Sequence, residues 1–128
     1  MREFLLVCAG GAVGTGARYL LTAWALAALG PSFPWGTFAV NTIGSFLLAF
    51  VMYLGVESST ISPTVRLALG TGVLGGFTTY STFSFETMRY LQVGSWGLAI
   101  TNVLASVIVC LAACMAGWAA ARSMFGAP

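Results

Sequence analysis

Apolar residues fill four long stretches of the chain and are interrupted at only three places. The stretches span residues 4–29, 35–56, 64–91 and 96–121, with turns at 30–34 and 92–95 and a polar loop at 57–63. A membrane-spanning helix needs about 20 mainly apolar residues, since each residue adds about 1.5 Å. The pattern therefore predicts an all-α membrane protein, a single integral membrane domain (residues 1–128) with four transmembrane helices.

The third stretch is unlike the others near its centre. Residues 78–84 read TTYSTFS and put five Ser or Thr side chains and two aromatic rings at membrane depth. Gly72, Gly75 and Gly76 precede this stretch, and glycine and β-branched threonine both weaken a helix. We therefore expect the third helix to be broken near its centre. Unwound backbone in a membrane survives only inside protein or along a water-filled path, and such breaks often mark ion or substrate sites. A hydroxyl-rich packing face is the alternative.

The composition supports a membrane environment and excludes several functions. Hydrophobic residues make up 59% of the chain and charged residues 6%, whereas a soluble domain carries about 25% charged residues. The net charge of +2 includes no basic run, so nucleic acid is not an expected partner. Histidine, the commonest metal ligand and general base, is absent. The three cysteines form no C-x-x-C motif and are expected to pack as small apolar residues: Cys8, Cys110 and Cys114.

Three polar side chains inside the spans are candidates for function. Asn41 offers amide donors that could meet an anion, or it could join two helices by a hydrogen bond. Arg18 costs roughly +2.5 to +3.5 kcal/mol at a helix centre, so it reaches the membrane surface, binds a helix end, or supplies positive potential to a vestibule. Glu86 either pairs with Arg89, three residues on, or lines an ion path.

Two further patterns leave alternatives open. Tyr80 and Phe83 share one helix face, either as core packing or with positive ring edges turned toward an anion. Asn102, Ser106 and Cys110 form one polar stripe in the fourth span, which faces either a path or a partner helix. In the first span, Gly10 to Gly14 reads as a G-x-x-x-G helix contact.

Three motifs, in this order and at this spacing, resemble the Fluc/CrcB family of fluoride channels over essentially the whole chain. The motifs are Gly10-Gly11-x-x-Gly14-x-x-x-Arg18-Tyr19, Gly36-Thr37-x-x-x-Asn41-x-x-Gly44-Ser45-Phe46 and Gly75-Gly76-Phe77-Thr78-Thr79-Tyr80-Ser81-Thr82-Phe83-Ser84-x-Glu86. The sequence departs from the family at Tyr80, where Phe is usual, and at Asn102, where Tyr is common.

The resemblance implies an assembly and a cofactor. It implies an antiparallel, dual-topology homodimer with two pores. It also implies a structural sodium ion at the dimer interface, held by the backbone carbonyls of Gly75 and Thr78 of each subunit. The arginines favour one orientation only weakly, with three on one side and one on the other, which is compatible with insertion both ways: Arg2, Arg66 and Arg122 against Arg89.

The implied function is passive, fluoride-selective export that protects the cytoplasm. The protein would lie in the cell inner membrane, in contact with lipid, and would not be an enzyme. The resemblance assigns the fluoride pore to Asn41, Tyr80, Phe83, Ser81, Thr82, Ser106 and Glu86, with Arg18 in a vestibule or structural role. A small proton-coupled multidrug-type exporter is the alternative. Such an exporter needs a titratable acid deep in the membrane, and only Glu86 qualifies.

Overall fold

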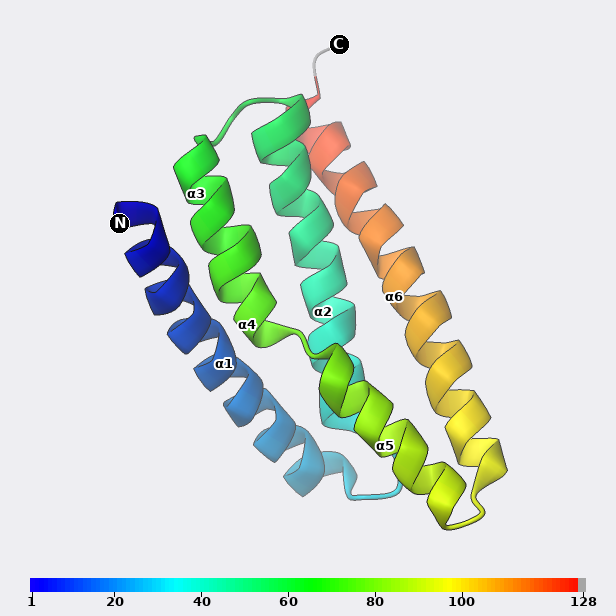
Figure 1. Ribbon diagram of the computed structural model, residues 1–128. Coiled ribbons are helices and arrows are strands. Elements are labelled where there is room, and N and C mark those ends of the chain that lie inside the picture. Colours follow the sequence, from blue (N-terminus) through cyan, green and yellow to red (C-terminus); the bar gives the residue numbers. More distant parts are fainter. Residues whose placement is uncertain (127–128) are drawn as a thin grey trace.

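The computed structural model describes residues 1–126 and is all α-helical (Figure 1). Its long helices are α1 (Arg2–Leu29), α2 (Trp35–Met52) and α6 (Trp96–Phe125), and α2 continues into a π-helical turn, η1 (Tyr53–Glu57). Within the described residues, these three helices are long and apolar enough to cross a membrane. The last two residues of the predicted domain, 127 and 128, lie outside the description.

The third predicted span is two helical pieces joined by extended backbone. The first piece comprises α3 (Pro63–Leu67), the π-helical η2 (Ala68–Leu74) and α4 (Gly75–Phe77), and the second is α5 (Tyr80–Gln92). Thr78 and Thr79 between them have ψ angles of 159° and 109°. The interruption lies inside the stretch for which the sequence predicts it. Hereafter Thr78–Thr79 is called the break.

Side chains cap the start of both pieces. Pro63 occupies the first turn of α3, and the Ser62 hydroxyl accepts a hydrogen bond of 3.3 Å from the Val65 N–H. At the break, the Thr79 hydroxyl accepts a bond of 3.2 Å from the Thr82 N–H. These are ordinary N-caps, which satisfy N–H groups that a helix start leaves unpaired. Thr79 is therefore extended itself, and its side chain caps the start of α5.

Small residues let the helices approach closely. A Cβ on Gly117 of α6 would lie 2.1 Å from the Phe46 carbonyl oxygen of α2, so these two helices meet backbone to backbone. Between α1 and η2, a Cβ on Gly14 would lie 1.9 Å from the Val73 carbonyl oxygen, and a Cβ on Gly10 would lie 2.9 Å from the Ala68 carbonyl oxygen. The G-x-x-x-G prediction is thereby confirmed as a contact between α1 and η2.

The core lies between α2 and its two neighbours. Its fully buried residues include Val40 of α2 and Ala99 and Ala121 of α6. The remaining outward surface is strongly apolar, as expected of helices that face lipid. Figure 1 shows α2 between the α3–α4 run and α6, with α5 turning away from α4 toward the first turn of α6. The break therefore lies beside the middle helix.

Candidate functional site

Asn41 holds the break from α2. Its Oδ1 accepts a hydrogen bond of 2.7 Å from the Thr79 N–H, and its Nδ2 donates one of 3.0 Å to the Thr79 carbonyl. The amide thus pairs with both backbone groups of one residue, as a neighbouring strand would. Since the carboxamide has two N–H donors, one N–H is left for another partner. Interhelical bonding and ligand binding are therefore compatible in the same side chain.

Two donors from α1 hold the other side of the break. Arg18 Nη1 donates to the Thr78 carbonyl at 3.3 Å, and Thr15 Oγ1 donates to the Gly76 carbonyl at 3.4 Å. Helix ends leave carbonyls without helical partners, and a cation near a helix C-terminus is favourable. Arg18 therefore binds a helix end, one of the three roles left open by the sequence.

One cavity, of about 410 Å³, lies where α2, α5 and α6 meet at the break. Four of the predicted pore residues line it together with Thr78: Asn41, Tyr80, Phe83 and Ser106. The rings of Tyr80 and Phe83 have centroids 5.5 Å apart and are tilted by 44°. Tyr80 is 79% exposed, so most of its surface is left uncovered by residues 1–126. We call this space the aromatic cavity.

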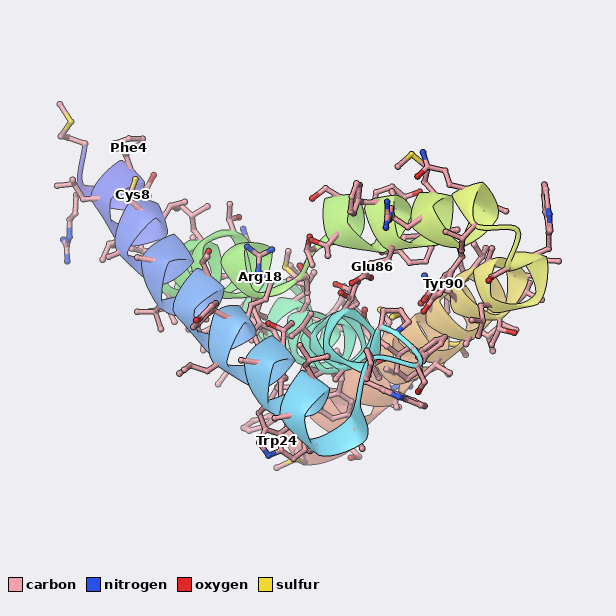
Figure 2. The ribbon with its side chains drawn as sticks, turned by 90° about the horizontal axis from the view of Figure 1, so that it is seen from below. Phe4, Cys8, Arg18, Trp24, Glu86 and Tyr90 are labelled. Carbon is pink, nitrogen blue, oxygen red and sulfur yellow. The ribbon has the colours of Figure 1, made fainter. Side chains whose placement is uncertain are left out.

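A second cavity, of about 490 Å³, lies on the α1 side of α5 and is lined by Arg18, Thr82 and Glu86. Figure 2 shows Glu86 projecting from α5 toward α2, and Arg18 reaching from α1 toward the connection between α4 and α5. Glu86 Oε1 accepts a hydrogen bond of 2.7 Å from Thr37 Oγ1, and Oε2 is buried without a partner in the described structure. The pairing of Glu86 with Arg89 is wrong: the nearest donor comes from α2 and not from its own helix.

The predicted site residues are therefore divided between two cavities, and some line neither. Ser81 is exposed beside the break, with its Oγ 3.3 Å from Thr79 Oγ1. Gly75 is also exposed, and no side chain within residues 1–126 donates to its carbonyl. The same residues contain no group of three His, Cys, Asp or Glu side chains fit for a metal ion. A cation at the break would be held by neutral oxygens.

Several polar contacts were not predicted from the sequence. Thr37 is 4% exposed and binds Glu86, and Thr79 is 6% exposed and binds Asn41. Thr37 lies four residues before Asn41, so helical spacing could have placed both on one face of α2. In α6, Asn102 is buried and its Nδ2 donates to Thr87 Oγ1 at 2.9 Å. The polar stripe of α6 thus faces α5 at this position.

Known proteins are similar to this chain along nearly its whole length. Residues 5–118 match the family described as CrcB-like protein, Camphor Resistance (CrcB). A protein of Anaeromyxobacter dehalogenans, named fluoride-specific ion channel FluC, is 50% identical over 126 residues, which are 98% of this chain and 100% of that protein. Proteins of the same name from Caulobacter vibrioides and Sorangium cellulosum are 48% and 44% identical, over 98% and 97% of this chain and 99% and 98% of their own lengths.

Proposed function

The chain belongs to the CrcB family of multi-pass membrane proteins, and from this premise we propose that it is a fluoride-specific ion channel. The observation that carries the proposal is the full-length similarity to proteins of that name, one of which is 50% identical over 98% of the chain. The relatives are ion channels, and the chain is not an enzyme. We assign it to the cell inner membrane, where a fluoride exit would protect cytoplasmic enzymes.

The cavities have the chemistry that fluoride requires. Fluoride is small and strongly hydrated, so entry requires donors that replace its water. The aromatic cavity offers the free N–H of Asn41 and the hydroxyl of Ser106, and its aromatic rings have positive edges. None of these groups carries a full charge, which avoids trapping the anion. Transport is accordingly passive and follows the membrane potential.

Residue roles follow from this placement. Asn41, Tyr80, Phe83 and Ser106 meet the ion in the aromatic cavity. Thr82 and Glu86 line the second cavity beside Arg18. Ser81 presents its hydroxyl on the exposed side of the break. We propose that these residues together form the fluoride path of the assembled channel.

Exposed polar residues that follow the break support a homodimer. Tyr80 is 79% exposed, and Ser81 and Ser84 are exposed beside it, near the middle of the third span. Lipid tails cannot hydrogen-bond to such groups, so protein or water must cover them. A second, antiparallel copy would do so at the break of both chains. Two copies per particle should be counted by single-molecule photobleaching in membranes, and one gene product should suffice for activity. Activity that appears only with an oppositely oriented paralogue would rule out the homodimer.

We also propose a structural sodium ion at the dimer interface, held by the carbonyls of Gly75 and Thr78. The donor set fits, because neutral carbonyl oxygens suit hard cations, and the Thr78 carbonyl, which accepts from Arg18, keeps a second lone pair for the ion. The Gly75 carbonyl has no side-chain donor within residues 1–126, and the exposed glycine leaves it open toward a partner chain. Replacing sodium by N-methylglucamine should lower the unfolding temperature of the dimer. Equal unfolding temperatures in the two salts would remove sodium from the structure.

Fluoride efflux from liposomes that contain the purified protein tests the function. A fluoride electrode should record efflux well above that of protein-free liposomes once valinomycin allows potassium to balance the charge. Chloride-loaded liposomes are the matched control and should show little efflux. A rate that depends on a proton gradient and not on voltage would instead favour a proton-coupled exporter. Absence of efflux above the protein-free level would refute the channel.

A further inference from the structure

We propose that Arg18 is a positioning residue of the channel: its guanidinium holds the Thr78 carbonyl and thereby fixes the backbone of the break. The inference rests on the proposed function, because it ties this contact to fluoride conduction. It differs from a purely electrostatic role in a vestibule, for which the charge matters and no particular partner is needed. The contact itself is the hydrogen bond of 3.3 Å from Arg18 Nη1 to the Thr78 oxygen.

The need for such a donor arises at the end of the helical run 63–77. Carbonyls in the last turn of a helix have no partner in the helix itself. Here α1 supplies two of the missing donors, Thr15 to the Gly76 carbonyl and Arg18 to the Thr78 carbonyl. Thr15 and Arg18 are three residues apart, so they lie on one face of α1. The same face of α1 carries Gly14, whose lack of a Cβ permits close approach to Val73.

The contact also accounts for an arginine inside a membrane span. An isolated Arg at a helix centre costs roughly +2.5 to +3.5 kcal/mol, and a carbonyl without a partner in lipid costs several kcal/mol. One hydrogen bond reduces both costs. Arg18 is half-buried and reaches from α1 toward the connection between α4 and α5 (Figure 2). Its direction is therefore toward the protein and not toward the membrane surface.

The position of this carbonyl links Arg18 to the aromatic cavity. Thr78 lines that cavity beside Tyr80 and Phe83, and the next residue, Thr79, is bound at both its N–H and its carbonyl by Asn41. Two successive peptides are thus held by two different helices, α1 and α2. Tyr80 begins α5 directly after them. Release of the Thr78 peptide would therefore change the orientation of the first turn of α5 and of both rings.

Hydrogen exchange and flux together test the proposal. Arg18→Met keeps an unbranched apolar stem and removes both charge and donors, whereas Arg18→Lys keeps the charge and one donor group. In nanodiscs, Arg18→Met should raise amide exchange across residues 74–84 by about tenfold or more, as expected for losing one hydrogen bond to a charged group. Its fluoride flux should fall severalfold at both low and high salt. Arg18→Lys should keep near-wild-type exchange. Arg122→Met, an exposed arginine in the last turn of α6, is the matched control and should change neither quantity.

The other outcomes overturn the proposal. Unchanged exchange at residues 74–84 in Arg18→Met, or a flux difference between wild type and Arg18→Met that disappears at high salt, would mean that the charge acts at a distance. Equal exchange in Arg18→Lys and Arg18→Met would also contradict it. If Arg18→Met does not fold, solid-state NMR of wild type decides: with ¹³C label in threonine carbonyls only, a dipolar coupling should join the Arg18 guanidinium ¹⁵N to the Thr78 carbonyl. Thr78→Ser assigns the signal, because it leaves that carbonyl unlabelled and the coupling should then be lost. Absence of the coupling in wild type would contradict the proposal. If wild type shows no efflux, the channel assignment fails, and the exchange and NMR results still decide whether Arg18 holds the break.

Discussion

The Thr37 hydroxyl donates a hydrogen bond of 2.7 Å to Glu86 Oε1 and so joins the first turn of α2 to the middle of α5. Thr37 is 4% exposed, and the second carboxyl oxygen of Glu86 is buried without a partner in the described structure. The contact therefore holds α5 against α2, C-terminal to the break. It also supplies the only polar partner of Glu86 within residues 1–126.

Thr37→Val should lower the free energy of unfolding by about 1–3 kcal/mol, because it leaves a buried carboxyl oxygen without its donor. Valine has nearly the same shape as threonine, so packing is little changed. Denaturation in mixed micelles measures the difference. Thr101→Val, at an exposed position of α6, is the matched control and should be within about 0.5 kcal/mol of wild type. Equal values for the two variants would show that the Thr37–Glu86 bond does not stabilise the fold.

Phe83→Ile should reduce fluoride flux by at least tenfold and leave the dimer folded. The substitution keeps an apolar side chain of moderate size in the aromatic cavity and removes the ring, whose positive edge is the feature proposed to meet fluoride. Efflux from liposomes measures the change, and size-exclusion chromatography checks the fold.

Phe85→Ile is the matched control for the ring, since Phe85 lies on the same helix and is 58% exposed. It should retain wild-type flux. If Phe83→Ile also retains it, Phe83 does not belong to the path.

Two substitutions of Asn41 should separate stability from conduction. Asn41→Leu removes both bonds to Thr79 and should destabilise the protein by about 1–3 kcal/mol, because backbone groups at the break lose their partners. Asn41→Asp keeps an acceptor for the Thr79 N–H but loses the donor to the Thr79 carbonyl, so it should also destabilise the protein. It places an acidic group where an anion must pass, so its flux should fall at least as far as that of Asn41→Leu.

Unfolding and efflux measured on the same preparations test this separation. If Asn41→Asp conducts like wild type, Asn41 is not in contact with the ion. If Asn41→Leu is as stable as wild type, the two bonds to Thr79 contribute nothing to the fold.

The sequence predicted the helices well and their polar contacts only in part. The lengths of the apolar stretches predicted the helices. The cluster of Thr and Ser after three glycines predicted the interruption, which the structure has at Thr78–Thr79. Spacing also put Tyr80 and Phe83 on one face, and their rings are 5.5 Å apart. The π-helical turns were not predicted, because no residue pattern in the chain marks them.

Contacts between helices were harder to predict. Glu86 and Arg89 satisfy the spacing of a helical pair, yet Thr37, distant by 49 positions, is the partner of Glu86. Spacing along a helix reports only neighbours within that helix. It contains no information on which faces of two helices meet. The partner of Glu86 is set by the packing of α5 against α2.

Gly14→Ala should destabilise the protein more than its small added volume suggests. A Cβ at this position would lie 1.9 Å from the Val73 carbonyl oxygen and 2.9 Å from the Phe77 nitrogen, both backbone atoms that no rotamer change can move. The helix α1 must therefore shift away from η2 and α4, at a cost of about 1–3 kcal/mol for overpacking. Gly16→Ala, two residues further along α1, has no atom within 4 Å of the new Cβ and should be neutral or slightly stabilising, because alanine favours the helix.

Since Arg18 and Thr15 reach the break from α1, Gly14→Ala should also lower fluoride flux, whereas Gly16→Ala should not. Equal unfolding free energies and equal efflux for the two variants would show that the close approach of α1 to η2 is not required.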